Sequence, residues 1–192
     1  MPRRRRTGLI GTRTSAHDVI NLMEVRDQLP DHPVPDEIRR RPAPATILIE
    51  GLVDQPVTLE HDALAVLRQD SLDEPFACEE GWTVPGLRWR GVILADVLAL
   101  AHPLEEAQFV TVCSGGYSVS VRLSEAHHIL VCDTLDDIPL SVEHGGPWRL
   151  VVPNGKCFTS VKRVERLEVT AQCEPSTGEL IARKRLTRPL EP

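Results

Sequence analysis

Aromatic residues make up only 4% of this 192-residue chain, although 41% of its residues are hydrophobic. The core must therefore be built mainly from Leu, Val, Ile and Ala, which suffices for a domain of this length. No apolar stretch approaches the roughly 20 residues of a membrane-spanning helix, so we expect no membrane span. The net charge of −6 lacks the basic excess of nucleic-acid-binding proteins, and we expect no nucleic-acid partner.

The cysteines form no Cys-x-x-Cys pair, which argues against a structural zinc site and an iron–sulfur cluster. A Cys-x-x-Cys-His motif for covalent haem is also absent, so we expect neither haem nor an iron–sulfur cluster in this chain. An odd, widely spaced set of thiols does not predict a disulfide framework. The five thiols are Cys78, Cys113, Cys132, Cys157 and Cys173.

The chain also lacks a Gly-rich turn between a strand and a long helix, so neither a Rossmann nor a P-loop nucleotide site is indicated. The Arg run at residues 3–6 is followed by polar residues instead of the apolar segment of an export signal. We therefore expect a basic tail on a cytoplasmic protein. Pro and charge are dense over residues 1–45, which predicts an irregular strap lying over a domain.

Short β-branched runs and short helical patterns alternate along residues 46–172. This alternation predicts an α+β domain built on mixed, mostly antiparallel sheets with short helices, followed by a tail over residues 173–192. Thr58 and Ser124 are the expected helix caps. Strands are predicted at 46–53, 108–113, 117–123, 148–152 and 166–170, an apolar run at 129–132, and helical segments at 59–67, 94–101 and 124–128.

The segment from Phe76 to Gly91 combines Cys78 with two of the three Trp residues, and its Gly and Pro residues predict bends. Side chains in bends are often presented to ligands. Because a thiolate is both a soft metal ligand and a strong nucleophile, one Cys here could define a site. A lone Cys is more often a small buried hydrophobe, and this segment alone leaves that alternative open.

A second dense segment spans residues 143–162, where residues 145–147 and 153–155 are predicted turns on either side of a strand. Backbone N–H groups in such turns, with cationic side chains nearby, can bind phosphate or another polyanion. The alternative is a pair of hairpins with ordinary solvated cations. The side chains concerned are His144, Arg149, Lys156, Ser160 and Lys162.

Together these segments resemble the molybdopterin-binding domain of the sulfite oxidase family over residues 46–170. The resemblance rests on Cys-Glu-Glu-Gly-Trp at 78–82, His-Gly-Gly-Pro-x-Arg-Leu-Val-Val-Pro at 144–153 and Ser-Val-Lys-x-Val-x-x-Leu-Glu-Val at 160–169. It implies the molybdopterin-binding fold of that family and a molybdenum–molybdopterin cofactor, a pyranopterin dithiolene. It also implies that Cys78 is the protein thiolate on molybdenum and the catalytic residue.

The resemblance extends to the contacts of the cofactor. His144 matches a family contact to the pterin and Arg149 a family contact to the cofactor, while Ser160, Val161 and Lys162 match the triplet that meets its anionic tail.

Further contacts are implied outside these motifs. Cys113 lies near a family position that lines the cofactor. Asn21 and Glu24 belong to a stretch similar to a family strap that packs on the pterin.

The implied activity is two-electron oxygen-atom transfer to or from a small-molecule substrate, with electrons exchanged with a separate carrier. Sulfite oxidases proper place Arg residues soon after the metal Cys, whereas Glu79 and Glu80 follow it here, so sulfite is a poor fit. The dimerisation domain of larger family members is missing from residues 173–192, and we expect a monomer. Two alternatives stay open: a non-catalytic cofactor-binding or carrier protein, and a Cys nucleophile assisted by His127, His128 or His144.

Overall fold

The computed structural model describes residues 40, 44, 46–77 and 83–186, with side chains up to residue 184. The predicted strap over residues 1–45 lies outside the described residues, apart from positions 40 and 44. The same holds for three predicted site residues, Asn21, Glu24 and Cys78. None of the helices in the described ranges is long and apolar enough to cross a membrane.

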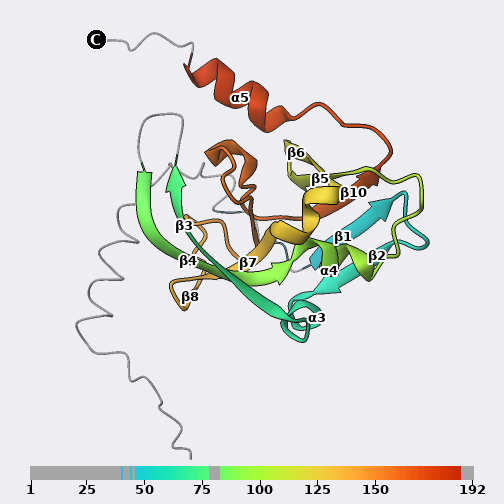
Figure 1. Cartoon of the computed structure of the whole chain (residues 1–192), viewed down its shortest axis with the longest axis horizontal. Helices are drawn as coiled ribbons and strands as arrows, with labels where there is room; N and C mark the ends of the chain where they lie inside the picture. Colours follow the sequence, from blue (N-terminus) through green and yellow to red (C-terminus); the bar gives the residue numbers. More distant parts are fainter. Residues whose placement is uncertain (1–39, 41–43, 45, 78–82, 187–192) are drawn as a thin grey trace, which may run out of the picture.

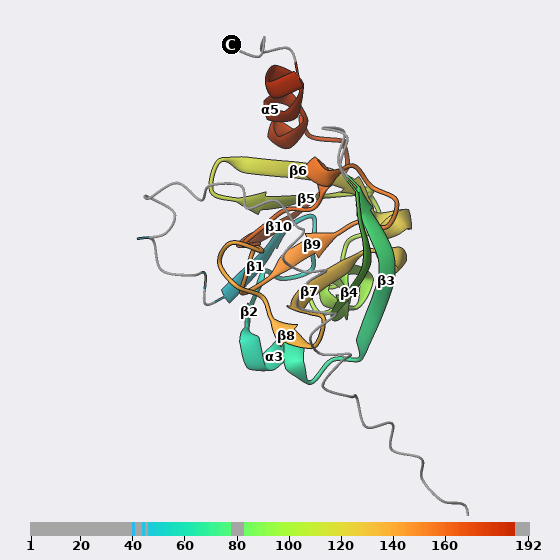
Figure 2. The same ribbon diagram turned by 90° about the vertical axis from the view of Figure 1, so that its left-hand side faces the viewer.

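The fold is α+β and contains two sheets, seen side by side in Figures 1 and 2. The first has the strand order β2-β1-β10-β5-β6. Strands β1 and β10 run parallel and the other pairs antiparallel, which confirms the prediction of mixed, mostly antiparallel sheets. Its strands are β1 (Thr46–Gly51), β2 (Val57–Glu60), β5 (Phe109–Ser114), β6 (Tyr117–Arg122) and β10 (Arg166–Thr170).

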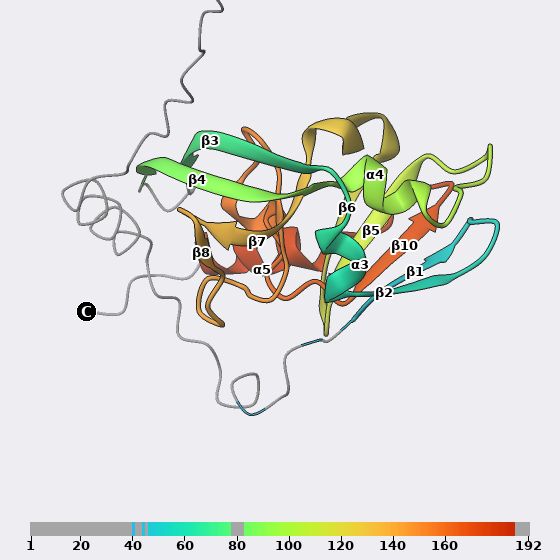
Figure 3. The ribbon, with the colours of Figure 1, turned by 90° about the horizontal axis from the view of Figure 1, so that it is seen from below.

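The second sheet is antiparallel throughout its described pairs, in the order β3-β4-β7-β8, with β9 also paired to β7. Strands β3 and β4 form one long curved ribbon along an edge of the molecule (Figure 3). The strands are β3 (Gln69–Ala77), β4 (Thr83–Ile93), β7 (Leu130–Leu135), β8 (Ile138–Pro139) and β9 (Arg149–Val151).

Two hydrophobic clusters fill the interior, and β9 joins them. Trp148 and Leu150 belong to the larger cluster, which packs the first sheet against helix α4 (Leu94–Ala99). Val151 belongs to the smaller cluster, which is built around Trp89 of β4. Because successive strand residues face opposite sides, Arg149 shares the side of Val151 and faces the smaller cluster around Trp89.

The predicted helix over 59–67 is wrong in its first part. Residues 57–60 form β2, in which Leu59 pairs with Ile47 and is buried. Pairing with β1 therefore overrides the local helical pattern, and α3 is confined to His61–Ala65. The expected cap is also wrong, since Glu60 is the N-cap residue and makes no side-chain cap hydrogen bond.

The expected cap at Ser124 is wrong as well. The helical turn exists as the 3₁₀ helix η1 (Leu123–His128), but Arg122 is its N-cap residue and again makes no side-chain cap hydrogen bond. The predicted helix at 94–101, the hairpin of β5 and β6 and the strands at 148–152 and 166–170 are confirmed to within a few residues. The remaining helices are η2 (Cys157–Thr159) and α5 (Thr177–Leu186), the latter within the predicted tail.

The bends predicted between Thr83 and Gly91 take the form of irregularities within a single strand: the register with β3 shifts opposite residues 85–86, where Gly86 has φ +72°. A register shift between Arg90 and Gly91 lets β4 continue along β7 without a turn. A Cβ atom on Gly91 would lie 2.1 Å from the carbonyl oxygen of Val131 and 2.5 Å from the Cα of Cys132. Glycine at this position therefore permits the close approach of two backbones and does not end the strand.

We predict that Gly91→Ala destabilises the protein by about 3 kcal/mol, since backbone atoms on β7 must move to admit a methyl group. Urea unfolding followed by circular dichroism measures the change. Gly116→Ala is the matched control, because a Cβ atom there meets nothing within 4 Å. Equal midpoints for the two variants would contradict the close approach of β4 and β7.

Candidate functional site

The structure brings five predicted site residues into one region, the 144–162 cluster, consisting of His144, Arg149, Ser160, Val161 and Lys162. The segment after η2 runs beside β9, because the Leu150 N–H donates to the Val161 carbonyl (2.8 Å) and the Val164 N–H to the Trp148 carbonyl (2.9 Å). An isolated bridge pairs Arg149 with Lys162. Residues separated by more than ten positions in sequence thus become neighbours.

The predicted turn at residues 145–147 packs directly on this segment. Gly145 has φ +99°, and a Cβ atom on it would lie 2.8 Å from the Cγ of Lys162. Its carbonyl accepts a hydrogen bond from the Arg163 N–H (2.9 Å). Glycine is therefore required both by the backbone conformation and by the close contact, which explains its place in the motif.

Arg149 lies at the centre of the cluster and is only 4% exposed. Its guanidinium carbon is 4.9 Å from the ring centroid of Phe76 on β3 and 4.8 Å from that of Trp89 on β4. Its Nη1 donates to the carbonyl of His144 (3.1 Å). One side chain thus links β9, the turn after His144 and both strands of the long ribbon.

The charge of Arg149 is poorly compensated. Burial lowers the pKa of its guanidinium to about 10, although the nearby thiols of Cys132 and Cys157 act in the opposite direction. Among the described residues it has no carboxylate partner, and its buried Nε has no hydrogen-bond partner. A buried cation with an unused donor is costly unless an anion or acceptor meets it. The residues present therefore fit an anionic ligand such as the tail of a pterin cofactor.

The other members of the cluster differ in how they could contact a ligand. The Nδ1 atom of His144 lies 3.0 Å from the Ser141 hydroxyl oxygen, and Lys162 Nζ donates to the Glu143 carbonyl (2.5 Å). Both side chains are half-buried, whereas Ser160 is buried. Val161 is fully buried in the larger hydrophobic cluster, so its side chain serves the core.

Cys113 is not part of the cluster. It lies on β5 in the first sheet, where its buried thiol contacts Arg166 Nη2 (3.6 Å) and the Thr111 carbonyl (3.8 Å). Burial raises the pKa of this thiol, while Arg166 opposes the change. The Cys113 carbonyl accepts a hydrogen bond from the Glu165 N–H (3.0 Å), and the predicted contact of Cys113 with a cofactor stays a prediction.

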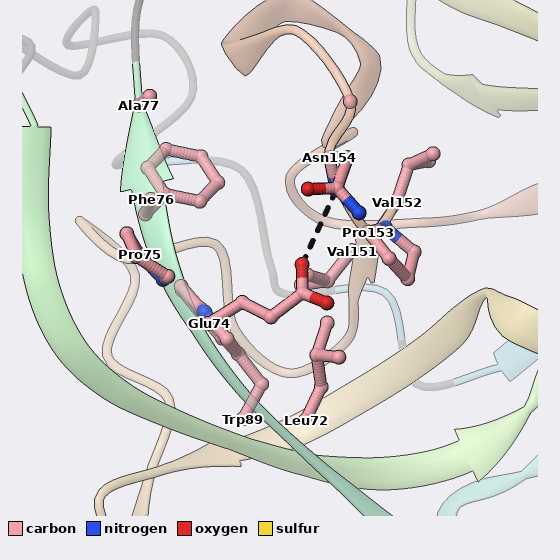
Figure 4. Close-up of a pocket in the computed structure, with 11 residues that line it drawn as sticks. Leu72, Glu74, Pro75, Phe76, Ala77, Trp89, Val151, Val152, Pro153 and Asn154 are labelled. Carbon is pink, nitrogen blue, oxygen red and sulfur yellow. Dashed lines mark hydrogen bonds between the residues drawn. The ribbon is translucent and has the colours of Figure 1, made fainter.

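A cavity of about 290 Å³ adjoins the cluster, between the end of β3 and the turn at residues 153–155 (Figure 4). Phe76 and Trp89, which pack on Arg149, form part of its wall, together with Val151. Ala77, the last residue of β3, also lines it, and Cys78 is the next residue in the chain. The candidate metal ligand thus follows directly on a pocket-lining strand.

Glu74, Phe76 and Trp89 were not predicted as site residues. Side-chain burial alternates along β3, which places Leu72, Glu74 and Phe76 on one face. The same alternation can be seen in the sequence once residues 69–77 are taken as a strand. This alternation was not used to predict site residues, because no strand was predicted over residues 69–77.

Comparison with a solved structure shows which fold the chain has. The sulfane dehydrogenase SoxCD from Paracoccus pantotrophus shares this fold with a TM-score of 0.61 and 22% sequence identity. The match covers 67% of the present chain and 38% of that chain. The present chain therefore corresponds to well under half of the length of that protein.

Comparison of the amino-acid sequence with family profiles shows the family to which the chain belongs. The profile of the oxidoreductase molybdopterin binding domain matches residues 32–177. The chain therefore belongs to this family, the molybdopterin-binding oxidoreductase domains of sulfite oxidase type, which confirms the resemblance stated above. The family implies a molybdenum–molybdopterin cofactor, and the uncompensated Arg149 fits such an anionic group.

We predict that Arg149→Met separates stability from cofactor binding. Without cofactor, the free energy of unfolding should change by less than about 1 kcal/mol or rise, because the buried charge is removed while the aliphatic volume is kept. Retention of molybdopterin should fall at least about tenfold, because a charged hydrogen bond is lost. Urea unfolding and fluorescence of the extracted, oxidised pterin measure the two effects.

The matched control is Arg122→Met. Arg122 also lies over an aromatic ring, 5.1 Å from the centroid of Phe109, but it is exposed and distant in the fold from the cluster. It should change neither quantity appreciably. An Arg149→Met protein that keeps its full complement of pterin would show that this cation does not face the cofactor.

Proposed function

We propose that this chain is a molybdopterin-dependent oxidoreductase that catalyses two-electron oxygen-atom transfer to or from a small-molecule substrate. The observation that carries the proposal is the buried guanidinium of Arg149, which has no carboxylate partner among the described residues and whose Nε donor is unused, an arrangement that favours an anionic partner. Family membership supports the choice of molybdopterin as that partner.

The residues of the 144–162 cluster would bind and orient the cofactor. Arg149 offers Nε as a donor, and its contacts with Phe76 and Trp89 fix the direction of that donor. Lys162 and His144 add polar groups at the half-buried edge of the same region. Bound there, a molybdenum–pyranopterin dithiolene supplies the two-electron redox centre and the oxygen-exchange chemistry.

Cys78 is proposed as the thiolate ligand of molybdenum and the catalytic residue. Its position in sequence supports this role, because it follows Ala77 at the wall of the pocket. Thiolate is a suitable ligand for a metal that changes oxidation state beside the sulfurs of a dithiolene. The pocket, most of whose lining side chains are apolar, would hold the substrate.

The electrons of each turnover would be exchanged with a separate carrier protein, and we propose that the chain acts as a monomer. The alternative of a non-catalytic cofactor carrier predicts bound pterin without turnover. A screen of sulfite, sulfoxides, N-oxides and nitrate with artificial electron donors and acceptors would identify both the substrate class and the direction of the reaction.

Protein produced in a molybdopterin-competent host should contain close to one molybdenum per chain. Cys78→Ser should lower oxygen-atom transfer by at least about 100-fold, since loss of a metal ligand exceeds the cost of losing an outer partner, and should leave much of the pterin bound. Elemental analysis, pterin fluorescence and turnover measure these three outcomes.

Cys173→Ser provides the control, because Cys173 is an exposed thiol in the C-terminal region. It should retain metal, pterin and activity. A well-folded wild-type protein that stays free of molybdenum would refute the proposed enzyme, and full activity in Cys78→Ser would refute the ligand assignment.

A further inference from the structure

The pocket beside the 144–162 cluster combines an apolar wall with one charged group. Leucine, valine, proline and aromatic side chains form most of the wall, including Leu72, Val152 and Pro153. Glu74 is the one charged residue among the described residues that line it. No Lys, Arg or His side chain of the described chain reaches this lining, so the carboxylate of Glu74 is the one charge in direct reach of a ligand there.

The position of Glu74 is fixed by the opposite side of the pocket. Its Oε2 atom accepts a hydrogen bond from the backbone N–H of Asn154 (3.2 Å), which connects β3 to the turn at residues 153–155 (Figure 4). Its other oxygen, Oε1, has no hydrogen-bond partner within the described ranges. The carboxylate is therefore held in place and keeps one acceptor available to a ligand.

The pocket differs from the region that suits the cofactor. Arg149 lies against the rings of Phe76 and Trp89 but does not itself line the pocket. The two aromatic side chains thus contact the cationic guanidinium and also line a pocket whose one charged lining group in the described chain is negative. An anionic group in the pocket would meet the Glu74 carboxylate in partly desolvated surroundings, which is unfavourable.

We infer that Glu74 determines substrate specificity: the pocket admits a small molecule with an apolar body and a cationic group, and disfavours small anions. This inference rests on the proposed function, because it takes the pocket to be the substrate site. The apolar body would contact the wall formed by Phe76, Trp89 and Val151. The cationic group would bind Oε1 of Glu74 in a charge-assisted contact. Sulfite, a small anion without an apolar body, meets neither requirement.

The test compares three probes of similar size, each with a phenyl group: benzylammonium, benzyl alcohol and phenylmethanesulfonate. Ligand-observed NMR titration of the full chain, purified from a molybdopterin-competent host, gives their dissociation constants without any turnover. The wild-type protein should bind the cationic probe at least about tenfold more tightly than the anionic one. Equal or tighter binding of the sulfonate would overturn the inference whatever the variants do.

Glu74→Gln should reduce the preference for the cationic probe by about tenfold, while the retained carbonyl oxygen can still accept the hydrogen bond from Asn154. Asp73→Asn is the matched control. It removes the same charge from the neighbouring, exposed residue of β3, which does not line the pocket. It should leave the preference within about twofold. Equal shifts in the two variants would show a general effect of charge, and would overturn the role of Glu74.

The molybdenum content and turnover of the same wild-type preparation separate this inference from the proposed function. A metal-free protein that keeps the Glu74-dependent preference would refute the enzyme and leave the pocket specificity in place. A loaded, active protein without that preference would refute only the specificity.

Discussion

The buried guanidinium of Arg149 is the interaction on which the arrangement of the site depends. It is held between the rings of Phe76 and Trp89 and donates to the carbonyl of His144. These contacts connect the second sheet's long ribbon to the turn at residues 145–147. The same burial that fixes the side chain lowers its pKa and leaves its charge without a counter-ion among the described residues. A buried cation without a counter-ion is stabilised by an anionic ligand, which is why we propose that the cofactor binds here.

Two regions of opposite character meet at the aromatic pair. The Arg149 guanidinium packs on these rings. The same rings line the pocket, where Glu74 is the one charged residue among the described lining residues. This division suits a protein that must hold an anionic cofactor on one side and choose a different kind of molecule on the other. The rings of Phe76 and Trp89 would then serve both sites, since they position Arg149 and also form the pocket wall.

Much of the fold could be predicted from local patterns. The hairpin of β5 and β6, helix α4 and strand β10 follow from β-branched runs and amphipathic spacing, and the motifs at 144–162 identify the family. The failures have tertiary causes. Leu59 follows a helical pattern but pairs with β1, and Gly91 resembles a strand breaker but permits close contact with β7. The role of Glu74 depends on which face of β3 it occupies, so it could not be predicted while that strand was missed.

A crystal structure of the cofactor-loaded chain would show whether Arg149 binds the cofactor. We predict that an oxygen or nitrogen atom of the cofactor accepts a hydrogen bond from Arg149 Nε, at about 2.7–3.2 Å, with the guanidinium still between Phe76 and Trp89. A cofactor bound elsewhere, or an Arg149 Nε that remains without a partner in the loaded protein, would contradict it.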